Sequence, residues 1–346
     1  MAPRAQSHPS LDDARDLLEW QPPLGVLSVY VRIDPADRRG GWRTALRNGL
    51  ADAVREKPAD HEARVALRST ADRIARRFGD QELSSLPRGE LGFVEVGREP
   101  GRERWWSTHL APCEAANVYL EERPVLVPFL RLAARCRPRG IALVSAERVR
   151  LQQWEPGHLE ELKSWEMAAL PSDEGREHER NEERLAENRH RFLCECGRLS
   201  AKIAADRSWR DVIAFSAPQC VEHFRRGFPD ASPELVRGGD VDLIAEPAGR
   251  FLQLVETAVE RRDAELERRL VDRALEETRG GAHAVAGAQE AAAALEQGRV
   301  EHLIVDDATE PLIRRALSTG ARITPVSGAA AEGLAPAEGV AALLRY

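Results

Sequence analysis

From residue 282 to the C-terminus, short apolar segments alternate with amphipathic ones, and this alternation restricts the fold more than any other feature of the sequence. AHAVAG, VEHLIVDD and RITPVS are typical of strands, whereas AQEAAAALEQG and TEPLIRRALSTG are typical of helices that end at Gly298 and Gly320. The order strand, helix, strand, helix, strand predicts a mostly parallel sheet covered by helices, with a final strand in GVAALLRY.

A long helix is expected before this sheet, from about residue 250 to the glycine pair Gly280-Gly281. The middle of the chain predicts strands near 140–146 and 148–154, a turn in EPGH and a third strand. A second long helix follows, then a buried strand at 211–217 and a helix that begins near Pro218. The apolar stripe of that second long helix consists of Leu185, Phe192, Cys196, Leu199 and Ile203.

The N-terminal part predicts a strand at 26–33, two helices with apolar stripes, a two-strand meander joined by the turn GREPGRE, a short strand and another helix. Trp105 and Trp106 are adjacent on a strand of the meander, so their side chains face opposite sides of the sheet. One is expected in the core. The other lies either beneath the helices or at an interface.

These elements predict an α/β protein of three domains, and a length of 346 residues agrees with ~100–200 residues per domain. Residues 1–137 form an N-terminal domain of α+β character with a helical insertion. Residues 138–250 form a domain of a strand meander, a loop and a long helix. Residues 251–346 form the domain with the βαβαβ sheet.

Composition limits the classes of function. The formal net charge of -7 argues against a protein that coats nucleic acid, DNA included, by bulk charge, although a local basic face remains possible. The five cysteines form no CxxC pair, which favours a reducing compartment. The N-terminus lacks the pattern of a signal peptide, and no apolar run reaches the ~20 residues of a membrane span. We therefore expect a cytoplasmic protein with no membrane association.

The stretch SDEGREHERNEERLAENRHR, residues 172–191, contains only two apolar residues, Leu185 and Ala186. It directly precedes the apolar part of the second long helix, so its first turns lack an apolar anchor and are expected to project from the domain. Glu177 and His178 are candidate general bases toward a water molecule. Arginines suit contacts with phosphate or a terminal base, and the candidates for an RNA-contacting tip are Gly175, Arg176, Arg180, Arg184, Arg189 and Arg191.

A solvated, salt-bridged helix start is the competing interpretation of this stretch, because charge runs are usually solvated faces. For Arg189 the corresponding alternative is a side chain that extends along the protein surface to water. His178 and His190 lack a third ligand at useful spacing, so no metal site is predicted. The glycine pairs lie in neither a Walker nor a Rossmann context, and we expect no cofactor.

The C-terminal third resembles the last domain of the archaeo-eukaryotic peptide-chain release factor and Pelota family. AVAGAQEAAAALEQGRVEHLIVDD and GVAALLRY carry the resemblance, and the matching residues are Gly298, Val300, Leu303, Gly339, Leu344, Arg345 and Tyr346. NRHRFLCECGRLSAKIA is similar to the start of the long helix in the family's second domain. With VLSVYVRIDP near the N-terminus, the layout looks most like the bacterial members of this family. The resemblance extends from about residue 139 to 346.

This resemblance implies that the polar stretch takes the place of the loop that meets the tRNA acceptor end in the ribosome. In the family that loop carries Gly-Gly-Gln, but here it keeps only Gly175, and no glutamine occurs between Gln153 and Gln219. The family's codon-reading motifs are also absent. The implied role is ribosome rescue or quality control without codon reading, with peptidyl-tRNA hydrolysis undecided. A translational GTPase or the ribosomal stalk base is the implied partner of the C-terminal domain.

Two further functions stay open. One is that of a non-catalytic ribosome- or RNA-binding factor. The other is that of a stress-linked module that binds proteins.

Overall fold

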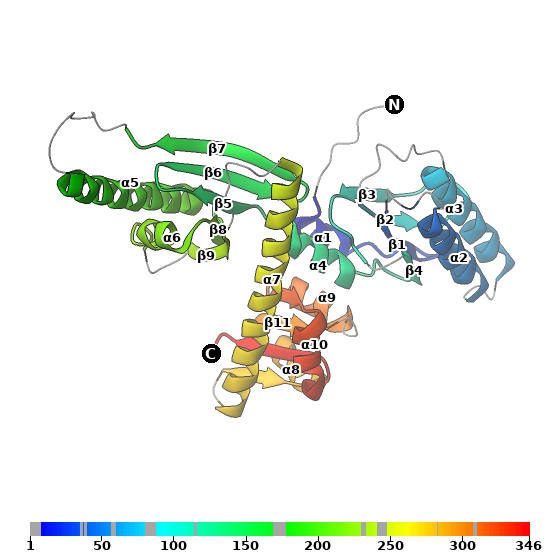
Figure 1. Cartoon of the computed structure of the whole chain (residues 1–346). Coiled ribbons are helices and arrows are strands. Elements are labelled where there is room, and N and C mark those ends of the chain that lie inside the picture. Colours follow the sequence, from blue (N-terminus) through cyan, green and yellow to red (C-terminus); the bar gives the residue numbers. More distant parts are fainter. Residues whose placement is uncertain are drawn as a thin grey trace. The chain divides into compact units, whose positions relative to one another are not determined.

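The computed structural model describes residues 8–34, 37, 40–56, 60–79, 88–113, 116–168, 178–229, 233–240, 248–281, 283–306 and 310–346. Two compact units are present. Unit 1 combines Met1–Cys136 with Asp263–Tyr346, and unit 2 is Arg137–Arg262. Within the described parts, the α/β class is confirmed, with three sheets and helices packed on them (Figure 1). No helix among these residues is both long and apolar enough to cross a membrane.

The first sheet of unit 1 has the strand order β3-β2-β1-β4 and is antiparallel throughout. Its strands are β1 (Val26–Arg32), β2 (Gly89–Glu95), β3 (Glu103–Thr108) and β4 (Ala116–Glu121). The helices α2 (Gly41–Glu56) and α3 (His61–Gly79) pack on one face, and the apolar stripe of α3, which consists of Leu67, Ala71, Ile74 and Phe78, is buried there. Trp106 is buried in the core of the opposite face. Trp105 lies under α3 with its ring centroid 5.8 Å from that of Phe78.

The second sheet of unit 1 has the order β10-β13-β11-β12. Its strands and helices are β10 (Ala284–Ala286), α8 (Ala288–Glu296), β11 (Val300–Val305), α9 (Glu310–Ser318), β12 (Arg322–Pro325), α10 (Gly328–Leu334) and β13 (Val340–Leu344). The short 3-10 helix η2 (Ala335–Ala337) leads into β13. Gly298 and Gly320 have φ angles of 66° and 71°, the left-handed conformation expected after a helix end.

The prediction of a mostly parallel sheet is wrong. Of the hydrogen-bonded strand pairs in this sheet, only β11–β12 is parallel, because β13 inserts between β10 and β11 and runs antiparallel to both. The alternation of helices and strands does not fix the direction of a strand that returns to the centre of the sheet. The helix before the sheet, α7 (Ala248–Arg279), agrees with the sequence.

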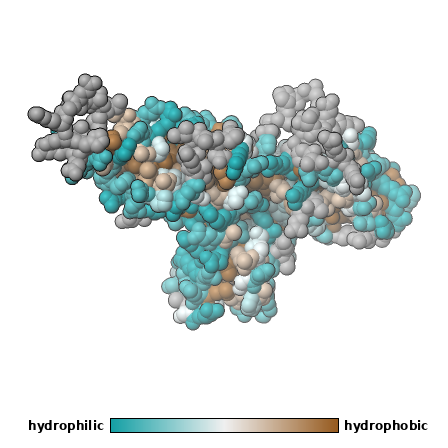
Figure 2. Space-filling view, viewed as in Figure 1, coloured by the Kyte–Doolittle hydropathy of each residue, from teal (hydrophilic) through white to brown (hydrophobic). Residues whose placement is uncertain are grey.

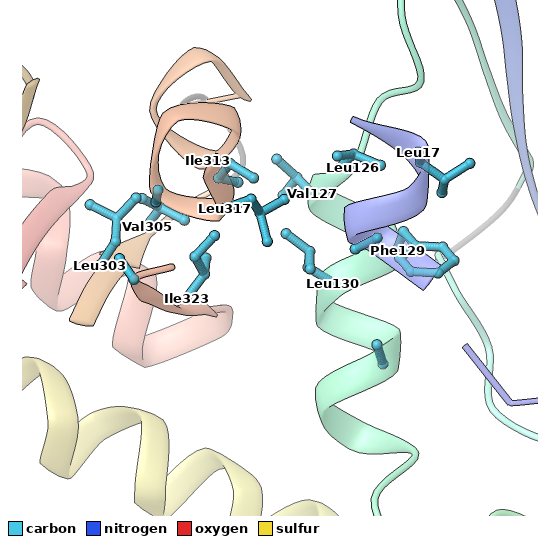
Figure 3. Close-up of a cluster of buried hydrophobic side chains, with 14 of the residues drawn as sticks. Leu17, Leu126, Val127, Phe129, Leu130, Leu303, Val305, Ile313, Leu317 and Ile323 are labelled. Carbon is cyan, nitrogen blue, oxygen red and sulfur yellow. The ribbon is translucent and has the colours of Figure 1, made fainter. Parts of the chain in front are cut away.

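One apolar core of unit 1 joins residues from both ends of the chain (Figure 3). Helices α1 (Leu11–Leu17) and α4 (Val127–Arg135) contribute one side of it, whereas α9, β11 and β12 contribute the other. Leu126, Val127 and Leu130 face Ile313, Leu317 and Ile323 across this core. Helix α1 was not predicted from the sequence.

A carboxylate also links these parts of unit 1. Helix α4 has no side-chain cap of its own, and the backbone N–H groups of Leu126 and Val127 donate to the Glu310 carboxylate at 2.9–3.1 Å. Glu310 belongs to α9, far away in the sequence, yet it satisfies the free donors at the start of α4. Burial raises the pKa of the Glu310 carboxyl, although these hydrogen bonds and Arg314 oppose the shift.

The sheet of unit 2 has the order β7-β6-β5-β8-β9, from β5 (Arg139–Val144), β6 (Arg148–Glu155), β7 (His158–Glu166), β8 (Asp211–Phe215) and β9 (Glu234–Gly239). Strand β9 was not predicted. Alternation along β5 separates two cores. Ala142 and Val144 face α5 (His178–Asp206) and α6 (Pro218–Arg225), whereas Ile141 and Leu143 face the first half of α7. Helices therefore cover both faces.

The division into three domains at residues 137 and 250 stays a prediction, and each predicted domain contains one of the three sheets. On the face shown in Figure 2, hydrophilic side chains predominate and apolar residues are visible only in small patches.

Candidate functional site

Helix α5 carries the polar stretch at its N-terminal end and an apolar face farther along. It begins at His178, and Leu193 is its first fully buried residue among those whose side chains are described. Before it, the side chains from Glu182 to Arg191 are exposed or half-buried. The exposed part of α5 therefore depends on a few polar contacts made by Arg189 and His190.

The buried face of α5 is rotated relative to the predicted stripe. Leu193, Cys196, Ser200 and Ala204 are buried, whereas Phe192, Leu199 and Ile203 are only half-buried at the edges. Burial raises the pKa of the Cys196 thiol to about 12, so this cysteine is neutral at physiological pH.

The rotation follows from a close crossing of α5 over α6 and the residues just beyond it. A Cβ on Gly197 would lie 2.1 Å from the backbone oxygen of Phe224, and one on Gly227 would lie 2.0 Å from that of Cys194. Only glycine permits such an approach of two backbones. Position 197 of α5 is thus fixed against α6.

Two polar contacts hold α5 nearer to its start. Arg189 donates to Glu147, in the turn between β5 and β6, at 2.7 Å. His190 meets His223 of α6 with 2.8 Å between their Nδ1 atoms, and the ring centroids are 4.8 Å apart. Both contacts lie about two helical turns before Gly197, toward the polar end of α5.

The structure describes only some of the predicted site residues. Gly175, Arg176 and Glu177 lie outside the described residues. His178 and Arg180 lie in the first turns of α5, and nothing is described of their side chains. The proposed roles of these five residues stay predictions.

The remaining predicted arginines differ in their surroundings. Arg184 is exposed, and Arg191 is exposed and lies 3.7 Å from Glu187 on the same helix. Arg189 is half-buried and paired with Glu147, which agrees with a surface arginine whose stem is partly covered. Arg184 and Arg191 are thus accessible to an anionic partner, whereas Arg189 serves to hold α5.

Sequence reasoning missed Glu147 and His223. Glu147 lies in a β-turn 42 residues before its partner, and His223 lies on a helix 33 residues after its own. Glu187 pairs with Arg191 on the same helix. Among the described residues, no group of three or more His, Cys, Asp or Glu side chains is placed to hold a metal ion.

Comparison with known proteins identifies the family of the segment that contains this helix. Residues 124–260 match the model of the bacterial archaeo-eukaryotic release factor family 10, so the family resemblance predicted from the sequence is confirmed. No curated protein matches the sequence.

Solved structures of low identity are also similar. An archaeal translation termination factor, aRF1, shows 20% identity and a TM-score of 0.28, with 97% of this chain and 98% of that chain covered. Archaeal Pelota, from a model of its ribosome-bound form with ABCE1, shows 14% identity, a TM-score of 0.44 and coverage of 98% and 95%. S. cerevisiae Dom34, a translation termination-like factor interacting with Hbs1, shows 14% identity, a TM-score of 0.43 and coverage of 77% and 81%.

Proposed function

Because its residues 124–260 belong to a bacterial branch of the archaeo-eukaryotic release factors, we propose that this protein acts on ribosomes in a termination-like or rescue process. The family match carries this proposal. The polar start of α5 is the part that meets the ribosome-bound tRNA, because it is charged and exposed and lies within the segment that matches the family model. No codon is read, since the sequence lacks the family's codon-reading motifs.

The proposed contact is electrostatic. Arg184 and Arg191 supply guanidinium groups for phosphate oxygens, and Gly175, Arg176 and Arg180 extend the same tip in the sequence. Each phosphate contact releases counterions, so binding weakens as salt rises. A tRNA acceptor end is a suitable partner because its unpaired bases are open to arginine stacking.

If the tip is catalytic, the reaction is ester hydrolysis of peptidyl-tRNA. Glu177 or His178 takes a proton from water while the water oxygen attacks the ester carbonyl carbon. The bond from that carbon to the ribose oxygen then breaks, and the ribose oxygen takes up a proton. The products are a peptide with a free carboxylate and a tRNA with a free hydroxyl.

The second candidate is a binding factor that does not hydrolyse. The absence of Gly-Gly-Gln, and of any glutamine between Gln153 and Gln219, favours it. In that case the protein occupies stalled ribosomes and leaves peptide release to another factor. A translational GTPase or the stalk base is the proposed partner of the C-terminal domain, and binding to other proteins is the remaining alternative.

The test mixes the purified protein with stalled ribosomes that carry labelled peptidyl-tRNA, and measures co-sedimentation and peptide release in one tube. We expect co-sedimentation that weakens with salt. Replacing Arg184 and Arg191 with alanine reduces the magnitude of the slope of log affinity against log salt by about 1.4–1.8, at 0.7–0.9 per lost phosphate contact.

Arg198→Ala is the matched control, since Arg198 is an exposed arginine farther along the same helix and pairs with Glu195. It leaves the salt slope unchanged. Release that disappears in Glu177→Ala or His178→Ala assigns hydrolysis, whereas binding without release assigns the docking role. Absence of co-sedimentation at low salt contradicts the proposal.

A further inference from the structure

The described N-terminal half of α5 is held by two polar contacts to the rest of unit 2. Among its described residues before Arg189, no side chain makes a hydrogen bond or ion pair to another element. Arg189 reaches Glu147, and His190 reaches His223 of α6. These contacts set the direction in which the polar end of the helix leaves the unit.

The contact between His190 and His223 depends on a single proton. With 2.8 Å between the two Nδ1 atoms, one nitrogen must carry a hydrogen and the other must present a lone pair. When both imidazoles are protonated, both Nδ1 atoms are donors and both rings are cationic. The attraction then becomes a repulsion. Histidine ordinarily changes charge between about pH 5 and 8.

We propose that His190 and His223 form a proton-sharing pair that positions the N-terminal half of α5 and releases it when both rings are protonated. The pair is a positioning element and does not react with substrate. Its consequence for ribosome binding rests on the proposed function, but the pair itself does not. The glycine crossing at Gly197 is insensitive to protons, so release affects only the turns before it.

Several charged and thiol side chains lie on the elements that carry the pair and on those that adjoin them. One helical turn away, α5 contributes Glu187 and Cys194, whereas α6 contributes Cys220 and the residue after its end is Arg226. Glu187 is engaged by Arg191, and in the adjoining strands and turn Glu147 is engaged by Arg189 and Arg150 by Glu161.

The direct test is an NMR titration of the imidazole nitrogens in the full-length protein. We expect His190 and His223 to titrate in two separated, coupled steps. In His223→Asn the amide takes over one hydrogen bond, and His190 then titrates in a single step. His190→Gln serves as the reciprocal variant. His158→Asn, at an exposed histidine of β7, leaves the coupled titration unchanged. Independent titration of His190 and His223 in the wild type overturns the proposal.

Hydrogen exchange measures the mechanical consequence. After correction for intrinsic rates, peptides that cover residues 182–192 exchange roughly threefold or more faster at about pH 5.5 than at about pH 7.5. This difference disappears in His223→Asn. An equal difference in the variant means that the pair does not hold the helix, which contradicts the proposal.

Ribosome co-sedimentation at the same two pH values separates this inference from the proposed function. Binding that falls at low pH in the wild type, but not in His223→Asn, supports both. Lack of binding at either pH removes the proposed function, while the titration and exchange results still decide on the pair.

Discussion

At the scale of single residues, Asp211 is the most consequential buried charge of unit 2. Its side chain is 0% exposed, and it lies 3.3 Å from Arg139 and 3.2 Å from Arg262, which are 2% and 3% exposed. Arg139 starts β5, Asp211 starts β8 and Arg262 lies on α7, so one carboxylate joins two strands of the sheet to the helix on one face. Both arginines are buried, and Arg262 also pairs with the more exposed Glu234.

Replacing Asp211 with alanine is expected to lower the free energy of unfolding by about 3–5 kcal/mol, because the buried guanidinium groups of Arg139 and Arg262 each lose a carboxylate partner and Arg262 keeps Glu234. Urea denaturation followed by circular dichroism measures it. Asp240→Ala is the control, since Asp240 is exposed and pairs with Arg237, and it changes stability by less than about 1 kcal/mol. Equal losses in the two variants contradict this account.

At the scale of elements, the crossing of α5 and α6 shows how far the sequence predicts the site. The recurrence of apolar residues predicted the long helix, and the charge of residues 172–191 predicted its polar start. The sequence did not indicate that Gly197 and Gly227 bring two backbones together, which rotates the buried face toward Leu193. Nor did it indicate His223, because a pairing between helices depends on tertiary packing.

Gly197→Ala is expected to destabilise the protein by about 1–3 kcal/mol, since its methyl group meets a backbone oxygen that cannot move aside. Exchange of α5 amides accelerates in the same variant. Gly249→Ala, at the start of α7 where no atom lies within 4 Å of the added Cβ, changes stability by less than about 1 kcal/mol. A tolerated Gly197→Ala means that the helices are farther apart than described.

The start of α4 offers a pH-dependent test. Burial raises the pKa of Glu310, so the folded state binds this proton more tightly than the unfolded chain. The stability from this group is fully present below the unfolded pKa and is lost as the pH rises through the folded pKa. The stability of the wild type relative to Glu310→Gln is therefore expected to fall as the pH rises above the ordinary glutamate pKa of about 4.3. Urea denaturation at several pH values measures it, and an increase over this range contradicts the sign.

At the scale of the whole molecule, unit 1 is discontinuous and unit 2 is inserted within it. The sequence correctly predicted an α/β protein with the βαβαβ segment near its end. It did not predict the core shared by α1, α4 and α9, because apolar stripes show which faces are buried but not which partner covers them. The prediction of a mostly parallel sheet was wrong for a similar reason, since long-range pairing sets the direction of β13.

This arrangement predicts unequal behaviour of fragments. Residues 137–262 are expected to fold alone and to melt cooperatively, because both of their cores are internal to unit 2. Residues 1–136 are expected to expose Leu126, Val127 and Leu130 and to gain structure only when residues 263–346 are added. Calorimetry of the separate and mixed fragments measures this, and a cooperative transition of 1–136 alone contradicts it.

The insertion of unit 2 within unit 1 also determines the order in which the two units can fold during translation. At roughly 5–20 residues per second, the ribosome needs roughly 10–40 s to pass from Cys136 to Tyr346. Unit 2 folds during this interval, but the apolar face of α4 waits for α9, whose Glu310 completes its first turn. The nascent chain therefore exposes an unfinished apolar core through most of its translation.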